Sequence, residues 1–499
     1  MNKILLKSLK KNMEIIKGYF LDCEDIIYRE FEVGQIIKVK MALINIDGLV
    51  DSDAISDHII RSLFLEEELK SFTEEGFRTT LLEGITREGL SAADIGEETH
   101  IEKVLDSILI GDTILLVDNI DIAIKISTKK FPARGVDEPK TETVIRGPRD
   151  GFNESLRTNT ALVRRRIRDT NLKSKMYKIG RRSKTSVVMM YVEDIVDKNI
   201  VTEVNNRLNA IDIDVVLDSS ILENLIEDNY LSPFPQLSNT ERPDEVAAGL
   251  YEGRVVLIVD NSPFALIIPG TIGTHLQSTE DYYTRWTEAT PIRLLRFIAL
   301  FLTLLSPALY VAITAFHPGL LPTKLIYFIA SSRVTVPFPA VIETVLMEGT
   351  MELIRESGNR ISGPVGTTIG IVGGLIIGQA AVEAGIVSPI IIIVVAISTI
   401  SSFAIPSYEF SAALRMSRFL FIILAGVLGL YGIILGLIIL ASHLLKMNSF
   451  GIPYMSPYSG LGIKEGDLKD TAVKVPIQYL QRRPGFTSPI NKIRMRRKK

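Results

Sequence analysis

RFIALFLTLLSPALYVAITAFH, residues 296–317, decides the fold class, because its residues 297–316 carry no charged side chain. A helix needs about 20 apolar residues to cross the ~30 Å hydrocarbon core of a bilayer. Three further windows, 361–382, 384–408 and 419–442, also lack charged residues and are long enough. The sequence therefore predicts a polytopic α-helical membrane domain over 286–445.

Between the first two windows lies a part-apolar segment, 323–355, that is broken by prolines and carries charges. Irregular backbone and ionisable side chains persist at membrane depth only where protein or water surrounds them. We therefore expect a broken or re-entrant element that lines an ion path or forms its gate, or else an extramembrane amphipathic helix with solvated glutamates. The candidate residues of the path or gate are Arg333, Pro337, Pro339, Glu343, Glu348 and Glu352.

Glycines recur every four residues in the window 361–382, at Gly366, Gly370, Gly374 and Gly378. Four-residue spacing places them on one helix face, where the missing Cβ atoms let another helix approach closely. We expect this ridge to pack helices together, either within one chain or between copies.

The polar first half, 1–285, alternates strand-like and helical patterns, as expected of α/β structure. GDTILLVDNIDIAIKI at 111–126 matches GRVVLIVDNSPFALII at 253–268, with glycine, Val-Asp-Asn and alanine at the same offsets. This duplication predicts two similar subdomains, 1–150 and 151–285. Asp-Asn between two apolar runs is typical of a tight hairpin turn rather than of ligand binding.

Ten lysines and arginines lie between Arg164 and Lys184, which we expect to form a basic linker helix. Such a run could be solvated, or could bind nucleic acid, anionic lipid or a partner subunit. Beside a membrane domain, lipid or a partner is the better ligand, and the net charge of −2 gives no global attraction for nucleic acid.

Basic residues also mark the side of the membrane on which the ends lie. Tyr282, Trp286, Arg293 and Arg296 precede the first span and suit an interfacial belt on the cytoplasmic face, and the tail 446–499 is strongly basic. We expect a cytoplasmic N-terminal region and a cytoplasmic tail. The single cysteine, Cys23, permits no intrachain disulfide and fits a reducing compartment.

The motifs of common catalytic and cofactor sites are missing from the sequence. The five histidines show no metal-ligand spacing, and neither a phosphate-binding glycine loop nor a nucleophile elbow occurs. We therefore expect no enzyme, no cofactor and no metal site.

Several long motifs together closely resemble the A subunits of the GerA family of spore germination receptors. They are FNESLRTNTALVRRRI (152–167), SPFPQLSNTERPDEVAAGLYEGRVVLIVDNSPFALIIPGT (232–271), DYYTRW (281–286), SSRVTVPFPAVIETVLMEGTMELIRESGNRI (331–361) and GPVGTTIGIVGGLIIGQAAVEAGIVSP (363–389).

This resemblance implies a protein of the spore inner membrane that acts with a nutrient-binding B subunit and a lipoprotein C subunit. It further implies that A subunits form a homo-oligomer, which is a nutrient-gated cation channel. A non-conducting scaffold subunit and a solute transporter are the alternatives, although the membrane half shows no evident inverted repeats.

Overall fold

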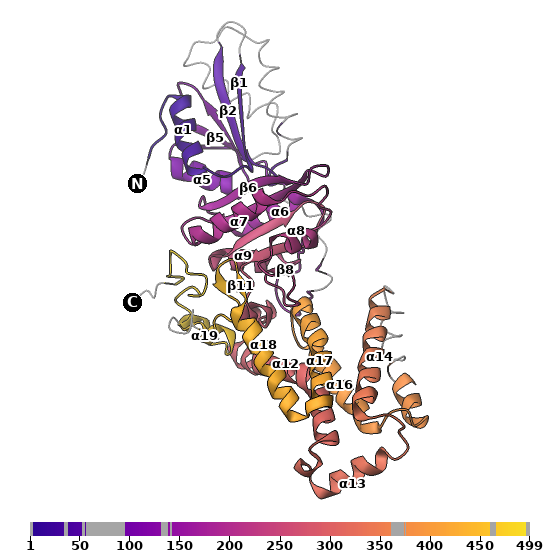
Figure 1. Ribbon diagram of the computed structural model, residues 1–499. Helices are drawn as coiled ribbons and strands as arrows, with labels where there is room; N and C mark the ends of the chain where they lie inside the picture. Colours follow the sequence, from indigo (N-terminus) through magenta and orange to yellow (C-terminus); the bar gives the residue numbers. More distant parts are fainter. Residues whose placement is uncertain are drawn as a thin grey trace. The chain divides into compact units, whose positions relative to one another are not determined.

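Two five-stranded antiparallel sheets form the framework of the N-terminal region in a computed structural model of the chain (Figure 1). The structure describes residues 3–33, 38–51, 55, 95–130, 138–139, 142–360, 374, 376–459 and 466–495. The chain divides into two compact units. Unit 1 is Met1–Glu227, Asn239–Pro269 and Arg482–Arg494, and unit 2 is Asp228–Ser238, Gly270–Gln481 and Met495–Lys499.

The first sheet has the strand order β1-β2-β4-β5-β3 and carries helices α1 and α5 on one face. Its elements are α1 (Leu9–Tyr19), β1 (Ile26–Val33), β2 (Val39–Ile46), β3 (Ile95–Glu98), α5 (Ile101–Ile110), β4 (Thr113–Val117) and β5 (Ala123–Ile126). Alternate strand residues point to opposite faces, so Ala42 and Ile44 pack under the helices while Met41 and Leu43 join a second cluster.

The second sheet repeats this topology in the order β6-β7-β9-β10-β8. Its elements are α6 (Leu156–Arg166), β6 (Leu172–Ile179), β7 (Thr185–Val192), α7 (Lys198–Ala210), α8 (Ser219–Ile226), β8 (Ser238–Thr240), α9 (Pro243–Tyr251), β9 (Val255–Val259) and β10 (Ala265–Ile268). The prediction of two similar α/β subdomains is confirmed.

The duplication extends to the first helix of each repeat, where one asparagine makes the same pair of hydrogen bonds. Asn12 Oδ1 accepts the Leu6 amide at 2.9 Å and its Nδ2 donates to the Leu6 carbonyl at 2.5 Å. Asn159 does the same with Asn153, at 2.9 and 2.5 Å.

The expected basic linker helix is wrong. Helix α6, which ends in Arg164–Arg166, begins the second repeat, and basic residues that follow lie on the edge strand β6 and in the turn after it.

The Asp-Asn pairs occupy the predicted hairpin turns and also cap a helix. Asp118 Oδ1 accepts the Leu9 amide at the start of α1, and Asp260 Oδ1 accepts the Leu156 amide at the start of α6, at 2.9 and 3.3 Å. The asparagine after each aspartate has φ of 63° and 64°, a conformation that asparagine tolerates better than most residues. Each turn thus closes a hairpin and satisfies an orphan helix amide.

Within unit 1 the two repeats are joined by backbone and by charge. The segment around Cys23 pairs with β6, where the Glu24 amide donates to the Ser174 carbonyl at 2.9 Å. Arg164, buried at the end of α6, grips Asp25 through two hydrogen bonds of 2.6 and 2.8 Å. Much of the basic run is neutralised inside unit 1 in this way.

The tail also contributes to unit 1. Arg483 Nε donates to the Tyr251 carbonyl at 2.7 Å, and the Ile490 amide donates to the Ile195 carbonyl at 2.9 Å. The Arg254 guanidinium lies 5.5 Å from the centre of the Phe486 ring. Residues 482–494 are therefore structural parts of unit 1.

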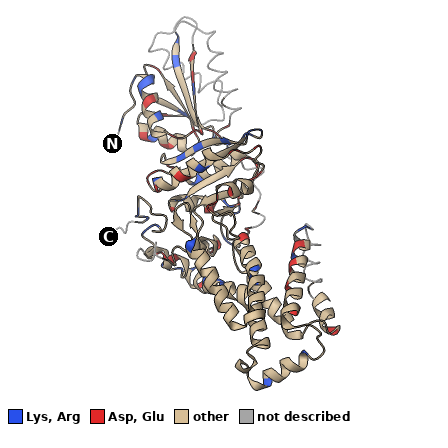
Figure 2. Ribbon diagram, viewed as in Figure 1, with Lys and Arg blue, Asp and Glu red and all other residues tan. Residues whose placement is uncertain are grey.

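Unit 2 is mainly helical, and most of its helices carry few charged residues, whereas the helix 340–360 carries several (Figure 2). Its elements are α10 (Ile272–His275), α11 (Glu280–Tyr283), α12 (Trp286–Ala315), η4 (Pro318–Leu320), α13 (Thr323–Ser332), α14 (Ala340–Arg360), α16 (Pro389–Phe403), α17 (Tyr408–Leu428), α18 (Leu430–Lys446), β11 (Asn448–Ser449), β12 (Ile452–Pro453), α19 (Leu468–Thr471) and η5 (Ile477–Tyr479). Among the described residues, α12 and α17 are long and apolar enough to cross a bilayer, and α16 and α18 are shorter apolar helices.

These helix bounds differ from the windows expected from charge alone. The window 419–442 is divided at Gly429, whose φ is 60°, into α17 and α18. Helix α17 begins at Tyr408 and continues through Arg415 and Arg418, which are buried within it. These two arginines therefore do not mark the end of a helix. The segment 323–355 is broken between α13 and α14, and the window 361–382 lies largely outside the described residues.

We expect Arg164→Ala to lower the free energy of unfolding of unit 1 by about 3–5 kcal/mol, because the substitution leaves Asp25 enclosed and unpaired. Urea titration of the full chain in detergent, followed by hydrogen–deuterium exchange in β6 and β7, measures this loss. Arg181→Ala is the control, since its ion pairs are exposed, and should change stability by no more than about 0.5 kcal/mol. Equal losses would contradict the role given to Arg164.

Glu142 should make unit 1 pH-sensitive. Burial, and secondarily the neighbouring Glu245 carboxylate, raise its pKa to about 8, while the Thr240 hydroxyl donates to it at 2.6 Å. Because the pKa in the folded chain exceeds its ordinary value of 4.5, stability is full below about pH 4.5 and falls as the pH rises through about 8. The slope contributed by this group is at most about 1.4 kcal/mol per pH unit.

The same exchange measurement between pH 6 and 8.5 should show this decline in the native chain and a flatter profile in Glu142→Gln. A profile as steep as that of the native chain would rule out Glu142 as its cause.

Candidate functional site

Helices α14, α16 and α17 surround a buried network of carboxylates and guanidinium groups. α16 supplies small polar residues to it, including Ser398 and Ser402, which are buried. α14 supplies the glutamates and α17 supplies arginines. The network therefore lies among apolar helices, where unpaired charges are costly.

The first contact holds the beginning of α14. Glu343, which is 0% exposed, accepts a hydrogen bond from the Ser388 amide and lies 3.7 Å from Arg333 at the end of α13. The Ser388 hydroxyl also lies 3.0 Å from the Tyr310 hydroxyl of α12. One carboxylate thus connects α13, α14 and the start of α16.

The second contact is the most deeply buried ion pair of the network. Glu348 Oε2 lies 2.7 Å from Arg418 Nη2, and both side chains are 0% exposed. The Ser398 hydroxyl donates to Glu348 at 2.9 Å, and Arg418 Nη1 donates to the same hydroxyl at 3.0 Å. Three helices therefore meet at one closed triangle of polar groups.

The third contact gathers three arginines around Glu352. Its Oε1 lies 3.3 Å from Arg418, 3.2 Å from Arg415 and 3.6 Å from Arg355. The guanidinium groups of Arg355 and Arg415 lie 5.0 and 5.6 Å from the ring centres of Phe403 and Tyr408, respectively. Aromatic faces attract such cations and so help to offset their removal from water.

Of the residues expected at an ion path, Arg333 pairs with Glu343, while Glu348 and Glu352 share Arg418. Pro337 and Pro339 lie in the turn between α13 and α14, where the Pro339 carbonyl accepts the Glu343 amide at 3.1 Å. The glutamates face neighbouring helices within the chain, and the exposed face of α14 instead carries Ile342, Leu346 and Leu353.

Sequence reasoning missed Arg355, Arg415 and Arg418 as members of the network. In the sequence, Arg418 borders the uncharged window 419–442, and Arg415 lies three residues before it. Their three-residue spacing, which places both on one helix face, was the available signal.

The expected glycine ridge is only partly within the described residues, because Gly366 and Gly370 lie outside them. A Cβ atom at Gly378 would lie 3.7 Å from the Ile392 side chain of α16, and one at Gly374 would meet open space. Close helix packing through the whole ridge remains a prediction.

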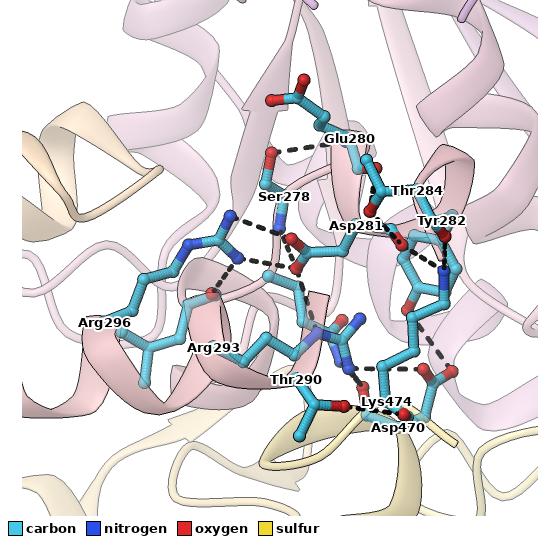
Figure 3. Close-up of polar contacts among 12 residues, drawn as sticks. Ser278, Glu280, Asp281, Tyr282, Thr284, Thr290, Arg293, Arg296, Asp470 and Lys474 are labelled. Atoms are coloured by element: carbon cyan, nitrogen blue, oxygen red, sulfur yellow. Dashed lines mark hydrogen bonds and ion pairs between the residues drawn. The ribbon is translucent and has the colours of Figure 1, made fainter. Parts of the chain in front are cut away.

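A second buried charge cluster lies where α12 begins. Figure 3 shows the Asp281 carboxylate between the guanidinium groups of Arg293 and Arg296. Arg296 binds both carboxylate oxygens at 2.6 and 2.9 Å, and Arg293 Nε donates at 3.0 Å. Both arginines are thus buried and paired within unit 2, and the expected interfacial belt stays a prediction.

The tail completes this second cluster. Lys474 Nζ donates to the carbonyls of Asp281 and Thr284, the latter at 3.0 Å, and Arg293 donates to the Asp470 carbonyl (Figure 3). Burial, and secondarily the charge of Arg293, lower the pKa of Lys474. Residues 466–475 are thus packed against α11 and α12.

The fold defines a class: an α/β unit joined to a polytopic helical unit with charged groups buried among its apolar helices. The family model described as Bacillus/Clostridium GerA spore germination protein matches residues 14–486. The chain belongs to the GerA family, as an A subunit, and it is a membrane protein and not an enzyme.

Three similar proteins illustrate this membership. The chain is 44% identical to spore germination protein GerLA of Bacillus cereus, over 90% of this chain and 89% of GerLA. It is 42% identical to a membrane protein, YfkQ, of Bacillus subtilis (strain 168), over 96% of this chain and 91% of YfkQ. A crystal structure of the N-terminal domain of the A subunit of the Bacillus megaterium spore germinant receptor GerK3 is 33% identical. The match covers 54% of this chain and 96% of the chain in the crystal structure, with a TM-score of 0.42.

We expect Arg418→Gln to destabilise the helical unit by about 3–5 kcal/mol, because it leaves Glu348 buried without an opposite charge, and Glu348→Gln to cost less, because Arg418 keeps its contact with Glu352. The double variant should lose clearly less than the sum of the two, since the residues interact directly. Thermal unfolding of the full chain in detergent measures all three. The exposed pair Glu356 and Arg360 is the matched control and should give small, additive changes. Additive losses at Glu348 and Arg418 would refute direct coupling.

Proposed function

We propose that this chain is the channel-forming A subunit of a nutrient germinant receptor in the spore inner membrane. Copies of the chain oligomerise, and a cation path opens when a B subunit binds nutrient, with a lipoprotein C subunit as the third partner. The observation that carries this proposal beyond family membership is the ion pair between Glu348 and Arg418, buried among apolar helices. Intramembrane ionisable residues are rare, and they commonly mark ion pathways or gating elements.

In this proposal the segment with Arg333, Pro337, Pro339, Glu343, Glu348 and Glu352 is the gate. Its glutamates hold α14 against α16 and α17 in the closed state. A rotation of α14 that exchanges these partners for water or ions would alter the path. Paired charges suit this task, because breaking one contact exposes two groups that favour hydration.

The outer face of α14 supports assembly from several copies. Ile342, Leu346 and Leu353 are exposed there, whereas Glu343 and Glu348 of the same helix are buried. The buried face of α14 packs against helices of its own subunit, and its exposed apolar face can pack against another copy of the chain. We therefore place the path between copies, next to α14.

The end of unit 2 at which α12 begins supports the orientation of this proposal. Phe297 near the start of α12 contacts Tyr458 after α18, with ring centres 5.8 Å apart, so the chain enters and leaves the helical unit at the same end. Lys446 ends α18, and Lys469 and Lys474 follow in the tail. The excess of positive charge supports a cytoplasmic position for this end of unit 2 and for the N-terminal region.

Glu343→Gln and Glu348→Gln should each change cation flux in the complete receptor reconstituted in liposomes. We expect flux without nutrient to rise and the response to nutrient to shrink, because the closed arrangement loses a contact. Single-channel recording with and without nutrient measures both. Glu356→Gln, on the exposed part of α14, is the control, and protein levels are matched before comparison.

Three outcomes would overturn parts of this proposal. Unchanged conductance and germination in both variants would remove these glutamates from the gate. Absence of ion flux from the purified chain in every oligomeric state, and from the receptor, would make it a scaffold. Saturable, substrate-dependent uptake would make it a transporter.

A further inference from the structure

The turn formed by Tyr230 and Leu231 projects two neighbouring apolar side chains from unit 2. They are 78% and 80% exposed, higher fractions than those of most large apolar residues in the described chain. No charged residue occurs between Asp228 and Glu241 in the sequence. The tip is therefore chemically unlike an ordinary solvated turn.

The base of this turn is fixed by hydrogen bonds. Gln236, which is 0% exposed, makes two hydrogen bonds with Asn229. Its Oε1 accepts the Asn229 amide at 3.0 Å, and its Nε2 donates to the Asn229 carbonyl at 2.9 Å. The Ser232 amide also donates to the Asn229 carbonyl at 3.1 Å. Because the base is held on both sides, exposure of the tip is a fixed feature of the fold and not the result of a loose loop.

The same turn is attached to the last turn of α18. The Ser232 hydroxyl lies 2.9 Å from His443 Nε2 and 3.2 Å from Met447 Sδ. Phe234, two residues on, is buried in the core of unit 2, with its ring centre 6.2 Å from that of His443. The position of the tip relative to α18 is thereby set.

The length of α18 fixes the depth of this attachment. Seventeen residues, Leu430–Lys446, span roughly 25 Å at 1.5 Å per residue, slightly less than the ~30 Å hydrocarbon core. The outward residues of α18 include Ile434, Ile438 and Leu445, all exposed and apolar. A helix of this length places its last turn at the boundary between hydrocarbon and head groups when its first turn lies near the opposite face.

We propose that Tyr230 and Leu231 insert into the head-group region of the bilayer beside the end of α18 and form a membrane anchor additional to the spanning helices. Tyrosine favours this region because its ring is apolar and its hydroxyl stays hydrated, while leucine reaches the acyl chains. Asp228 is held away, since its carboxylate accepts the Phe450 amide at 2.7 Å. A lipid surface, which is broad and apolar below its head groups, fits two adjacent protruding apolar side chains.

A spin label at Leu231→Cys tests this anchor in the full chain, purified without partners and placed in nanodiscs of phosphatidylethanolamine and phosphatidylglycerol. The native chain is the labelling blank, because Cys23 is buried. Leu217→Cys, at a 69% exposed leucine of unit 1, is the matched control. Collision with oxygen reports lipid, and collision with a water-soluble nickel complex reports solvent.

We expect the label at 231 to collide several-fold more with oxygen than with nickel, relative to the label at 217. Nickel access equal to that at 217 would overturn the proposal by placing the tip in water. Protection from both reagents would also overturn it by placing the tip against protein. As a second probe, Tyr230→Trp in a Trp286→Phe chain should be quenched by lipids brominated near the head group, and lack of quenching would contradict insertion.

Discussion

A charge that leaves water must be matched by an opposite charge, and this requirement organises both units of the chain. Glu348 with Arg418, Arg164 with Asp25, and Asp281 with Arg296 are each buried ion pairs. Removing one partner from such a pair usually costs far more than the pair itself contributes. The positions of α14, of the second repeat and of the start of α12 all depend on pairs of this kind.

The repeated α/β design shows how few residues define one subdomain. Two contacts occur in both repeats with nearly the same geometry. An asparagine of the first helix hydrogen-bonds the backbone before that helix, and an Asp-Asn turn caps the helix. These contacts connect the helix to the hairpin of the same sheet. What differs between the repeats is the surface, and the basic face of the second repeat is used for contacts with the first.

The sequence indicated the fold where the physical cause is local. The Asp-Asn turns were predictable because backbone conformation and side-chain chemistry are set within a few residues, and the sheets followed from alternating apolar runs. The network around Glu348 was only half predictable, because Arg415 and Arg418 lie about seventy positions away in the sequence. A charge at the edge of an apolar window looks like the end of a span until its partner is known, and Arg418 lies at such an edge.

The contribution of residues 482–494 to unit 1 bears on the order in which the protein is made. Ribosomes synthesise from the N-terminus. The hydrogen bonds from Ile490 to the Ile195 carbonyl and from Arg483 to the Tyr251 carbonyl can therefore form only after the helices of unit 2 have been synthesised. Until then, unit 1 lacks part of its surface while the nascent chain is being inserted. Maturation of the soluble half is thus coupled in time to completion of the membrane half, and the C-terminus acts as its final closing step.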